Sequence, residues 1–156
     1  MQFYEASEYQ PACSIKFQHY RNKILSLIPN AKVDHIGSSA ISGAISKGDL
    51  DILVAVEKLK LEGAVIKLQS LGFRVKQDTL RTNELCMLES ELEDVAFQVI
   101  ALGSQFEMFL IFRNELLADN EKVKQYNELK RSCIGMSQDA YRAYKSKFIE
   151  NVLGQA

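Results

Sequence analysis

The chain has 156 residues, of which 47% are hydrophobic and 25% are charged, a composition typical of an ordinary folded domain. Its 19 basic and 20 acidic side chains give a formal net charge of -1. This balance gives no electrostatic reason for bulk nucleic-acid binding or for attachment to a membrane surface.

Hydrophobic periodicity divides the chain into helices and strands. Apolar residues spaced three and four apart indicate helices, and short runs rich in β-branched residues indicate strands. The polar stretch 89–94 suits a hairpin turn, so the strands on either side of it should pair antiparallel. The expected elements, in chain order, are a helix over 13–28, a strand over 33–36, one or two helical turns within 38–45, a buried strand over 50–56, a helix over 61–68, strands over 73–76, 85–88 and 95–102, and helices from 106 onward, the last capped by Ser137.

This order of elements predicts an α+β fold, with a mixed β-sheet, helices packed on it and further helices at the C-terminus. No Pro/Gly-rich linker, internal repeat or low-complexity tract divides the sequence. We therefore expect a single domain over residues 1–156, with one hydrophobic core.

The cysteines and the lengths of the apolar runs indicate the cellular compartment of the protein. The three cysteines (Cys13, Cys86 and Cys133) are far apart and odd in number, which favours reduced thiols over a disulfide framework. No apolar segment approaches the ~20 residues that span a bilayer. The first ten residues, MQFYEASEYQ, do not have the form of a signal peptide. We expect a cytoplasmic protein.

Asp49 and Asp51 lie at the start of the predicted strand 50–56. Residues i and i+2 of a strand share one face, so the two carboxylates converge. They repel each other unless a cation lies between them or one of them is protonated. Oxygen ligands of this kind suit Mg²⁺, which takes waters and phosphate oxygens as its other ligands. The pair therefore predicts Mg²⁺-assisted phosphoryl or nucleotidyl transfer, in which both aspartates bind the metal and are catalytic.

Gly37 and Ser38 would supply the anion site that such a reaction needs. A glycine after a strand lets the backbone approach a phosphate, and N–H groups at a helix start favour an anion. Ser38 and Ser39 add hydroxyl donors, and Lys47 either reaches a phosphate or pairs with Asp49. An isolated Asp-x-Asp is usually a solvated strand end. The combination of a strand, Gly-Ser and then Asp-x-Asp at the next strand indicates this chemistry much more specifically than Asp-x-Asp alone.

The segment HIGSSAISGAISKGDLDILV, residues 35–54, closely resembles the HIGSTxVxGLxxKxxxDILV stretch of the GrpB family, also called UPF0157, of the nucleotidyltransferase superfamily. The resemblance implies a nucleotidyltransferase fold, with Gly37-Ser38 at the phosphates and Asp49 and Asp51 at the metal. It covers nearly the whole chain, and the further residues that carry it are Tyr9-Gln10-Pro11, Phe17, Phe112 to Leu116, Tyr126, Leu129-Lys130, Tyr141, Lys145 and Phe148-Ile149.

The sequence departs from this resemblance at two positions. The superfamily usually has a third carboxylate on a later strand, where this chain offers the neutral amide Gln98. Glu84, on the preceding strand, is the alternative candidate. GrpB-like sequences often carry an apolar residue where this chain has Asp49, and this second departure favours activity.

Other polar and aromatic residues have a structural interpretation that we favour. His35 is expected to make a structural hydrogen bond rather than to donate to a phosphate. The aromatic stripe Tyr141, Tyr144 and Phe148 is expected in the core. Further cationic candidates for a triphosphate are Arg81 and Arg113. A solvated helix face is expected for the basic cluster Lys122, Lys124, Lys130 and Arg131.

The leading hypothesis is a Mg²⁺-dependent nucleotidyltransferase that transfers a nucleoside monophosphate from an NTP to a hydroxyl of an unknown acceptor, either a small molecule or a protein. The competing hypothesis is a catalytically silent nucleotide- or metal-binding module that acts through a protein partner, and Gln98 favours it. A third is a phosphohydrolase that uses the same metal pair.

Overall fold

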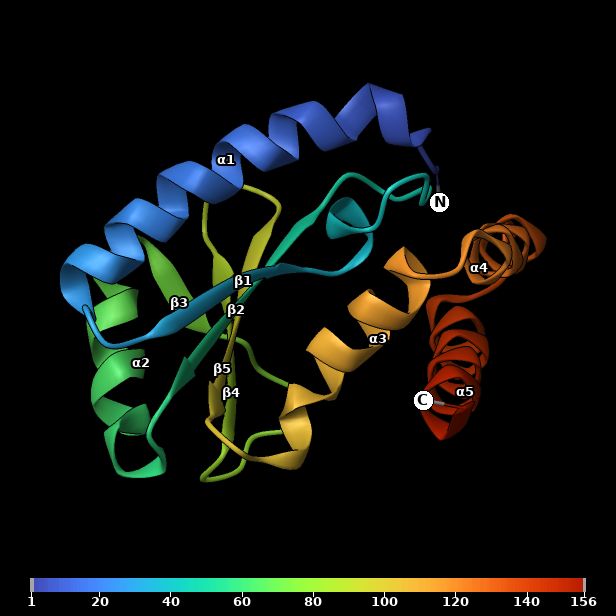
Figure 1. The fold of residues 1–156 in the computed structure, drawn as a ribbon. Coiled ribbons are helices and arrows are strands. Elements are labelled where there is room, and N and C mark those ends of the chain that lie inside the picture. Colours follow the sequence, from blue (N-terminus) through green and yellow to red (C-terminus); the bar gives the residue numbers. More distant parts are fainter. Residues whose placement is uncertain (1, 156) are drawn as a thin grey trace.

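The computed structural model describes residues 2–155, and these contain five strands in one mixed sheet, ordered β1-β2-β5-β4-β3 (Figure 1). β2 and β5 run parallel, and the other neighbours are antiparallel. The strands are β1 (Lys32–Ile36), β2 (Leu50–Val56), β3 (Phe73–Val75), β4 (Leu85–Ser90) and β5 (Val95–Ala101). The α-helices are α1 (Ala6–Leu27), α2 (Leu61–Gln69), α3 (Met108–Leu117), α4 (Asn120–Ser132) and α5 (Gln138–Gln155).

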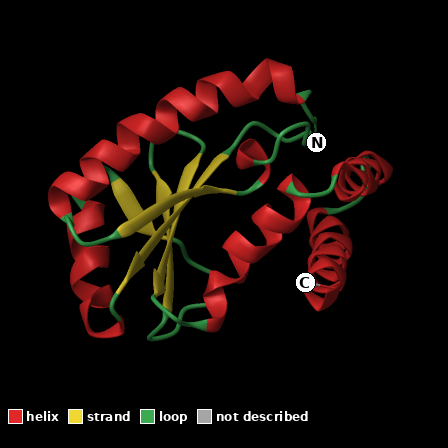
Figure 2. Ribbon diagram, viewed as in Figure 1, coloured by secondary structure: helices red, strands yellow, loops and turns green. Residues whose placement is uncertain are grey.

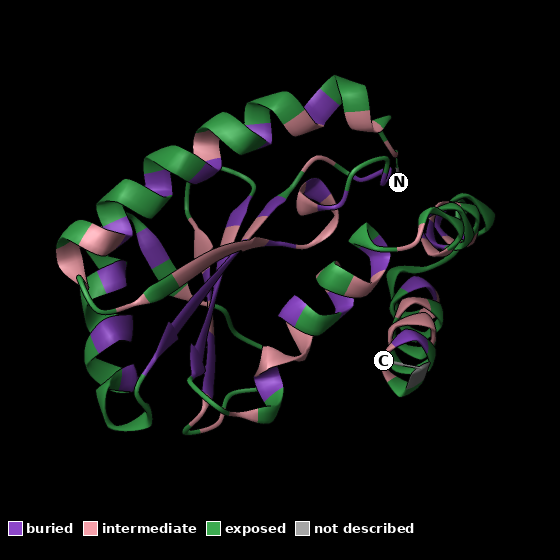
Figure 3. Cartoon of the chain, in the orientation of Figure 1, coloured by how far each residue is buried: buried purple, intermediate pink, exposed green. Residues whose placement is uncertain are grey.

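The sheet lies between two layers of helices (Figure 2). Alternation along β2 sends Leu50, Ile52 and Val54 to the face covered by α1 and α2, where the largest core cluster lies. Leu53 and Ala55 face the other way and pack with residues of α3. The buried residues are concentrated in the central strands and on the inner sides of the helices (Figure 3).

A third apolar cluster joins α3, α4 and α5 to the loop that follows β1. Phe112 and Leu116 of α3 pack there with Tyr126 of α4 and with Ile41 of the loop. The helices α4 and α5 lie beside α3 rather than on the sheet (Figure 1). This arrangement brings the C-terminal helices next to the glycine turn at residue 37.

The structure confirms the α+β fold class and the mixed sheet. The expected hairpin over 89–94 is present, since β4 and β5 pair antiparallel with Met87 opposite Gln98. Within 38–45 the helical part is the single 3-10 turn Ser38–Ala40. In the part of the chain that the structure describes, none of the helices combines the length and the apolar character needed to cross a membrane.

The first helix begins earlier than predicted, at Ala6, and runs through Pro11. Tertiary contacts hold these first turns in place. Tyr9 is buried and donates a hydrogen bond to the carbonyl of Ala44, and the Gln10 amide donates to the carbonyl of Ile41. These contacts compensate for the backbone hydrogen bond that a proline removes from a helix.

Candidate active site

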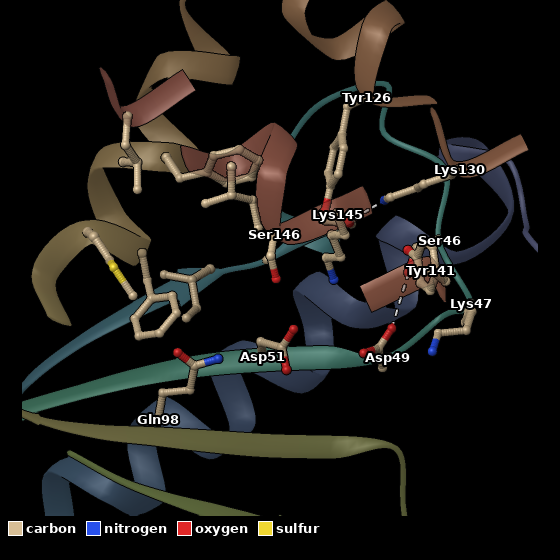
Figure 4. Close-up of a pocket in the computed structure, with 18 of the residues that line it drawn as sticks. Ser46, Lys47, Asp49, Asp51, Gln98, Tyr126, Lys130, Tyr141, Lys145 and Ser146 are labelled. Carbon is tan, nitrogen blue, oxygen red and sulfur yellow. Dashed lines mark hydrogen bonds between the residues drawn. The ribbon is translucent and has the colours of Figure 1, made fainter. Parts of the chain in front are cut away.

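A cavity of about 420 Å³ lies between the sheet and the C-terminal helices. Figure 4 shows Asp51 projecting from β2, Asp49 from the residue just before β2, and Gln98 from β5, all toward side chains of α4 and α5. The cavity combines charged groups with an apolar wall, the composition expected of a small-molecule site. Five of the residues predicted to form the site line it, namely Gly37, Ser38, Lys47, Asp49 and Asp51.

Asp49 and Asp51 both face this cavity, as the alternation along β2 predicts. The Ser46 hydroxyl donates to Asp49 Oδ1 at 3.2 Å, which fixes the orientation of that carboxylate. Burial, and then the negative charge of Asp49, raise the pKa of Asp51 to about 6. Two acidic groups on one wall of a cavity favour a shared cation.

Gly37 lies directly against Asp51 because Ile36 and Asp51 are register partners across β1 and β2. Its backbone has φ 74° and ψ -174°, a conformation that is essentially restricted to glycine. A Cβ atom at this position would lie 2.6 Å from Asp51 Oδ2. The turn therefore packs closely against the carboxylate, and only a residue without a side chain fits there.

The structure separates the two serines that follow. Ser38 lines the cavity, whereas Ser39 is buried and its hydroxyl lies 2.7 Å from His35 Nε2. The prediction that Ser39 binds nucleotide is therefore not supported, because its hydroxyl is engaged behind the turn. Since adjacent residues of a turn point in different directions, sequence could not tell which serine faces the site.

Lys130 also lines the cavity, although the sequence did not single it out as a site residue. We predicted a solvated helix face, but its side chain is only 1% exposed. Its ammonium donates to Ser38 Oγ at 2.6 Å and to the Ile45 carbonyl at 2.5 Å, and lies 4.1 Å from the centre of the Tyr126 ring. Burial lowers the pKa of Lys130 to about 7. Its spacing of four from Tyr126, on the buried stripe of α4, was the signal in the sequence that could have predicted its burial.

Lys145 and Lys47 complete the cationic side of the cavity. Lys145 extends from α5 toward the strand that carries Asp51 (Figure 4). Tyr126 is the largest cause of a raised pKa at Lys145, and Tyr141 and Asp51 act in the same direction. Lys47 lines the site with its ammonium 5.8 Å from the centre of the Tyr141 ring, and within residues 2–155 it forms no ion pair with Asp49.

Tyr141 belongs to both the core and the site. It is buried, as predicted, but it also lines the cavity and makes an edge-to-face contact with Phe3, with ring centres 6.0 Å apart. Tyr144 is 51% exposed, so the prediction that it lies in the core was wrong. It is three positions from Tyr141, but α5 contacts the rest of the protein along a narrower face than the aromatic stripe suggested.

Gln98, the neutral amide at the position where the resemblance predicts a third carboxylate, lines the cavity. Its Oε1 atom is buried without a hydrogen-bond partner. The alternative, Glu84, lies near the far end of β5, where its carbonyl accepts from the backbone N–H of Ala101. Within residues 2–155, no group of three or more His, Cys, Asp or Glu side chains could hold a metal ion.

His35 has the structural role that we predicted. It is hydrogen-bonded to Ser39 and stacks on Phe17 with ring centres 4.9 Å apart. Burial, and then the positive charge of Arg113, lower the pKa of His35 to about 4. Arg113 donates to the His35 carbonyl at 2.9 Å, and Arg81 pairs with Glu62 on the surface. Neither arginine lines the cavity, so the structure supports neither as a phosphate ligand.

Comparisons with known proteins agree on the family to which the chain is related. The model of the family described as GrpB protein matches residues 5–155. A UPF0157 protein of Vibrio cholerae serotype O1 is 57% identical over 157 residues, which cover 100% of this chain and 84% of that protein.

Solved structures show the same fold. The conserved protein GrpB from Enterococcus faecalis matches with a TM-score of 0.80 at 22% identity, over 99% of this chain and 98% of that one. Cid1 poly(U) polymerase in its Mg 3'-dATP-bound form matches with a TM-score of 0.58 at 14% identity, over 80% of this chain and 41% of that one. The chain therefore has a nucleotidyltransferase-like fold.

Proposed function

This chain belongs to the GrpB family, and from that premise we propose that it is a Mg²⁺-dependent nucleotidyltransferase. It would transfer a nucleoside monophosphate from an NTP to a hydroxyl group of an acceptor, with release of pyrophosphate. The observation that carries this proposal is the single cavity in which Asp49 and Asp51 face a glycine turn and three lysines.

Asp49 and Asp51 would hold the metal. They fit Mg²⁺ because both are carboxylates on one wall of the cavity, and because Gly37 leaves the space beside Asp51 free of any side chain. A bound Mg²⁺ would neutralise charge on the phosphates and orient them for in-line displacement. The raised pKa of Asp51 supports the assignment, since a cation relieves the repulsion between the two carboxylates.

The triphosphate would lie along the cationic side of the cavity. Lys145 and Lys47 supply positive charge there, and the backbone of the Gly37 turn, beside Ser38, supplies hydrogen-bond donors. These groups would bind the phosphates and hold the α-phosphorus in a fixed orientation. Positioning of this kind is a large part of the catalysis of phosphoryl transfer.

The apolar wall suits the nucleoside. Phe109, Phe112 and Tyr141 line the same cavity, and its volume lies in the range of small-molecule sites. Aromatic rings stack on a nucleobase with little preference for its identity. The base would therefore lie against this wall while the phosphates reach the lysines.

A second candidate is a catalytically silent nucleotide- or metal-binding module that acts through a protein partner. Gln98 favours it, because a neutral amide lines the cavity where a carboxylate would take a proton or complete a metal site. The two functions share one binding site and differ only in whether transfer follows.

The fate of the α-phosphate separates these functions. The protein, Mg²⁺ and each NTP labelled at the α-phosphorus would be incubated with fractionated small molecules and with candidate proteins. Nucleotidyl transfer predicts that the label joins an acceptor as pyrophosphate is released, and that Asp51→Asn abolishes both. Labelled nucleotide that binds but stays intact would favour the silent module. Release of inorganic phosphate alone would favour a phosphohydrolase.

A further inference from the structure

Lys130 bridges the two turns that flank the cavity. It lies on α4, more than eighty positions along the chain from both of its hydrogen-bond acceptors, Ser38 Oγ and the Ile45 carbonyl. It is almost completely buried and also lines the cavity. A fully buried lysine is uncommon because its charge is costly to remove from water, so its position beside the proposed site calls for an explanation.

We propose that Lys130 accepts the proton of the acceptor hydroxyl, relayed through the hydroxyl of Ser38. This inference rests on the nucleotidyl transfer proposed above. The acceptor oxygen forms a bond to the α-phosphorus, and the bond from that phosphorus to the oxygen bridging to the β-phosphate breaks. Pyrophosphate leaves with the electron pair. The acceptor proton moves to Ser38 Oγ as the proton of Ser38 moves to Lys130 Nζ, and Lys130 then releases it to solvent.

The contacts of Lys130 accommodate both charge states that this relay requires. A charged ammonium has three N–H donors, two of which serve Ser38 and Ile45 while the cation lies over the Tyr126 ring. A neutral amine keeps two donors and gains a lone pair. The Ile45 carbonyl can only accept, so it holds one N–H, and the hydroxyl of Ser38 can turn to donate to the lone pair.

The surroundings favour loss of the proton near neutral pH. Burial, and then the positive charge of Lys145, lower the pKa of Lys130 to about 7. Lys145 itself has a raised pKa and stays charged. A proton acceptor works best when its pKa is near the working pH. The other titratable or charged groups around Lys130 are Tyr126 on its own helix, Tyr141 on α5, and Lys47, Asp49 and Asp51 near the start of β2.

The other cavity-lining groups are less suited to this role. Gln98 is an amide without a basic atom, and the two aspartates would hold the metal. His35 does not line the cavity. Glu150 is an exposed carboxylate among the lining residues of α5, so it is the rival that an experiment must separate from Lys130.

Nuclear magnetic resonance of the unaltered chain tests the charge of Lys130 directly. Lysine labelled with ¹³C and ¹⁵N would be titrated from about pH 6 to about pH 10, where an ordinary lysine begins to lose its proton. Lys130→Arg identifies the resonance. We expect Lys130 to titrate near neutral pH while Lys147, which is exposed on α5, stays charged to above about pH 9. A Lys130 that stays charged throughout would overturn the inference.

Kinetics provide the second measurement, with glycerol as the hydroxyl acceptor and α-labelled NTP as the donor. Lys130→Arg keeps the positive charge but cannot give up its proton, so we expect a rate at least about a hundredfold lower, with nucleotide affinity within a few-fold of wild type. Lys147→Arg is the matched control. A Lys130→Arg variant with the wild-type rate and pH profile overturns the relay, as does a rate that depends on Glu150 when Glu150→Gln is tested.

The two proposals fail in different ways. If the wild-type chain does not bind Mg²⁺ with a non-hydrolysable NTP, the nucleotidyltransferase function fails. If it binds while Lys130 stays charged at every pH, only the proton relay fails. The titration uses the unaltered chain, so it decides the question even where a variant does not fold.

Discussion

Gly37 and Asp51 approach each other so closely that no side chain fits between them. A Cβ atom on Gly37 would lie 2.6 Å from Asp51 Oδ2 and 3.2 Å from the Asp51 Cβ. Ile36 and Asp51 are register partners in β1 and β2, so the sheet itself sets this distance. The position of the glycine turn and that of the Asp51 carboxylate are therefore coupled.

Gly37→Ala should damage both stability and binding. The backbone at Gly37 is one that other residues avoid, at a cost on the order of 1–3 kcal/mol, and the new methyl group would displace Asp51. Urea unfolding should report this loss, and titration calorimetry a weakened Mg²⁺-dependent nucleotide affinity. Gly63→Ala on α2 is the control, because nothing lies within 4 Å of its Cβ position and alanine favours a helix. Equal behaviour of the two variants would contradict the argument.

Asp51→Asn should stabilise the metal-free protein at alkaline pH. Asp51 has a pKa of about 6 in the folded chain, above its value of 3.8 when unperturbed, so the folded state binds its proton more tightly. The stability that protonated Asp51 contributes is therefore present in full below about pH 4 and is lost as the pH rises through about 6. We expect the variant to be more stable at about pH 8 by on the order of 1–3 kcal/mol, with no advantage at about pH 4.

Urea unfolding with a chelator present, repeated across this pH range, measures the difference. Asp78→Asn, at an exposed aspartate whose positive φ of 58° asparagine also tolerates, should follow the wild-type curve. An Asp51→Asn chain that is less stable than wild type at every pH would show that the carboxylate has a net stabilising partner.

His35 should make the protein sensitive to acid. Its pKa falls to about 4 in the folded chain, so the folded state resists protonation. The stability it contributes is present above about pH 6.5 and is lost as the pH falls toward 4, by roughly 1–2 kcal/mol at about pH 5. The stability difference between wild type and His35→Gln should shrink by that amount from about pH 7 to about pH 5. His19→Gln, at an exposed histidine of α1, is the control, and a constant difference for His35→Gln would refute the prediction.

Lys145→Ala should weaken nucleotide binding through lost charge. Lys145 extends into the cavity from α5 and stays protonated, so it would contact the triphosphate. We expect an affinity about tenfold lower and a weaker dependence of binding on salt, because one fewer cation faces the phosphates. Lys147→Ala removes a lysine two positions away that does not line the cavity, and it should bind as wild type does. If both variants bind equally, Lys145 does not contact the nucleotide.

The parts of the site that sequence predicted depend on short-range patterns. The run Leu50–Val56 fixed the bounds of β2, and alternation within it then placed Asp49 and Asp51 on one face. The turn at Gly37 followed from the end of the preceding apolar run. Each of these features involves residues that are neighbours in the chain, so local geometry was enough.

The parts that sequence missed depend on contacts between distant segments. Lys130 lies in a segment of alternating lysines and glutamates that is typical of a surface helix. Only the packing of α4 against the turn at Ser38 buries it. Arg113 is likewise drawn to the carbonyl of His35, away from the cavity. Neither partner could be identified before the helices were placed on the sheet.

Titration calorimetry with a non-hydrolysable NTP, with and without Mg²⁺, tests the central claim most directly. It would be performed on the wild-type chain and on Asp49→Asn and Asp51→Asn. We expect nucleotide binding that depends on Mg²⁺ and is lost in both variants, while Asp78→Asn retains it. No binding at millimolar nucleotide, or binding that survives both substitutions, would contradict the assignment of this cavity as a nucleotidyltransferase site.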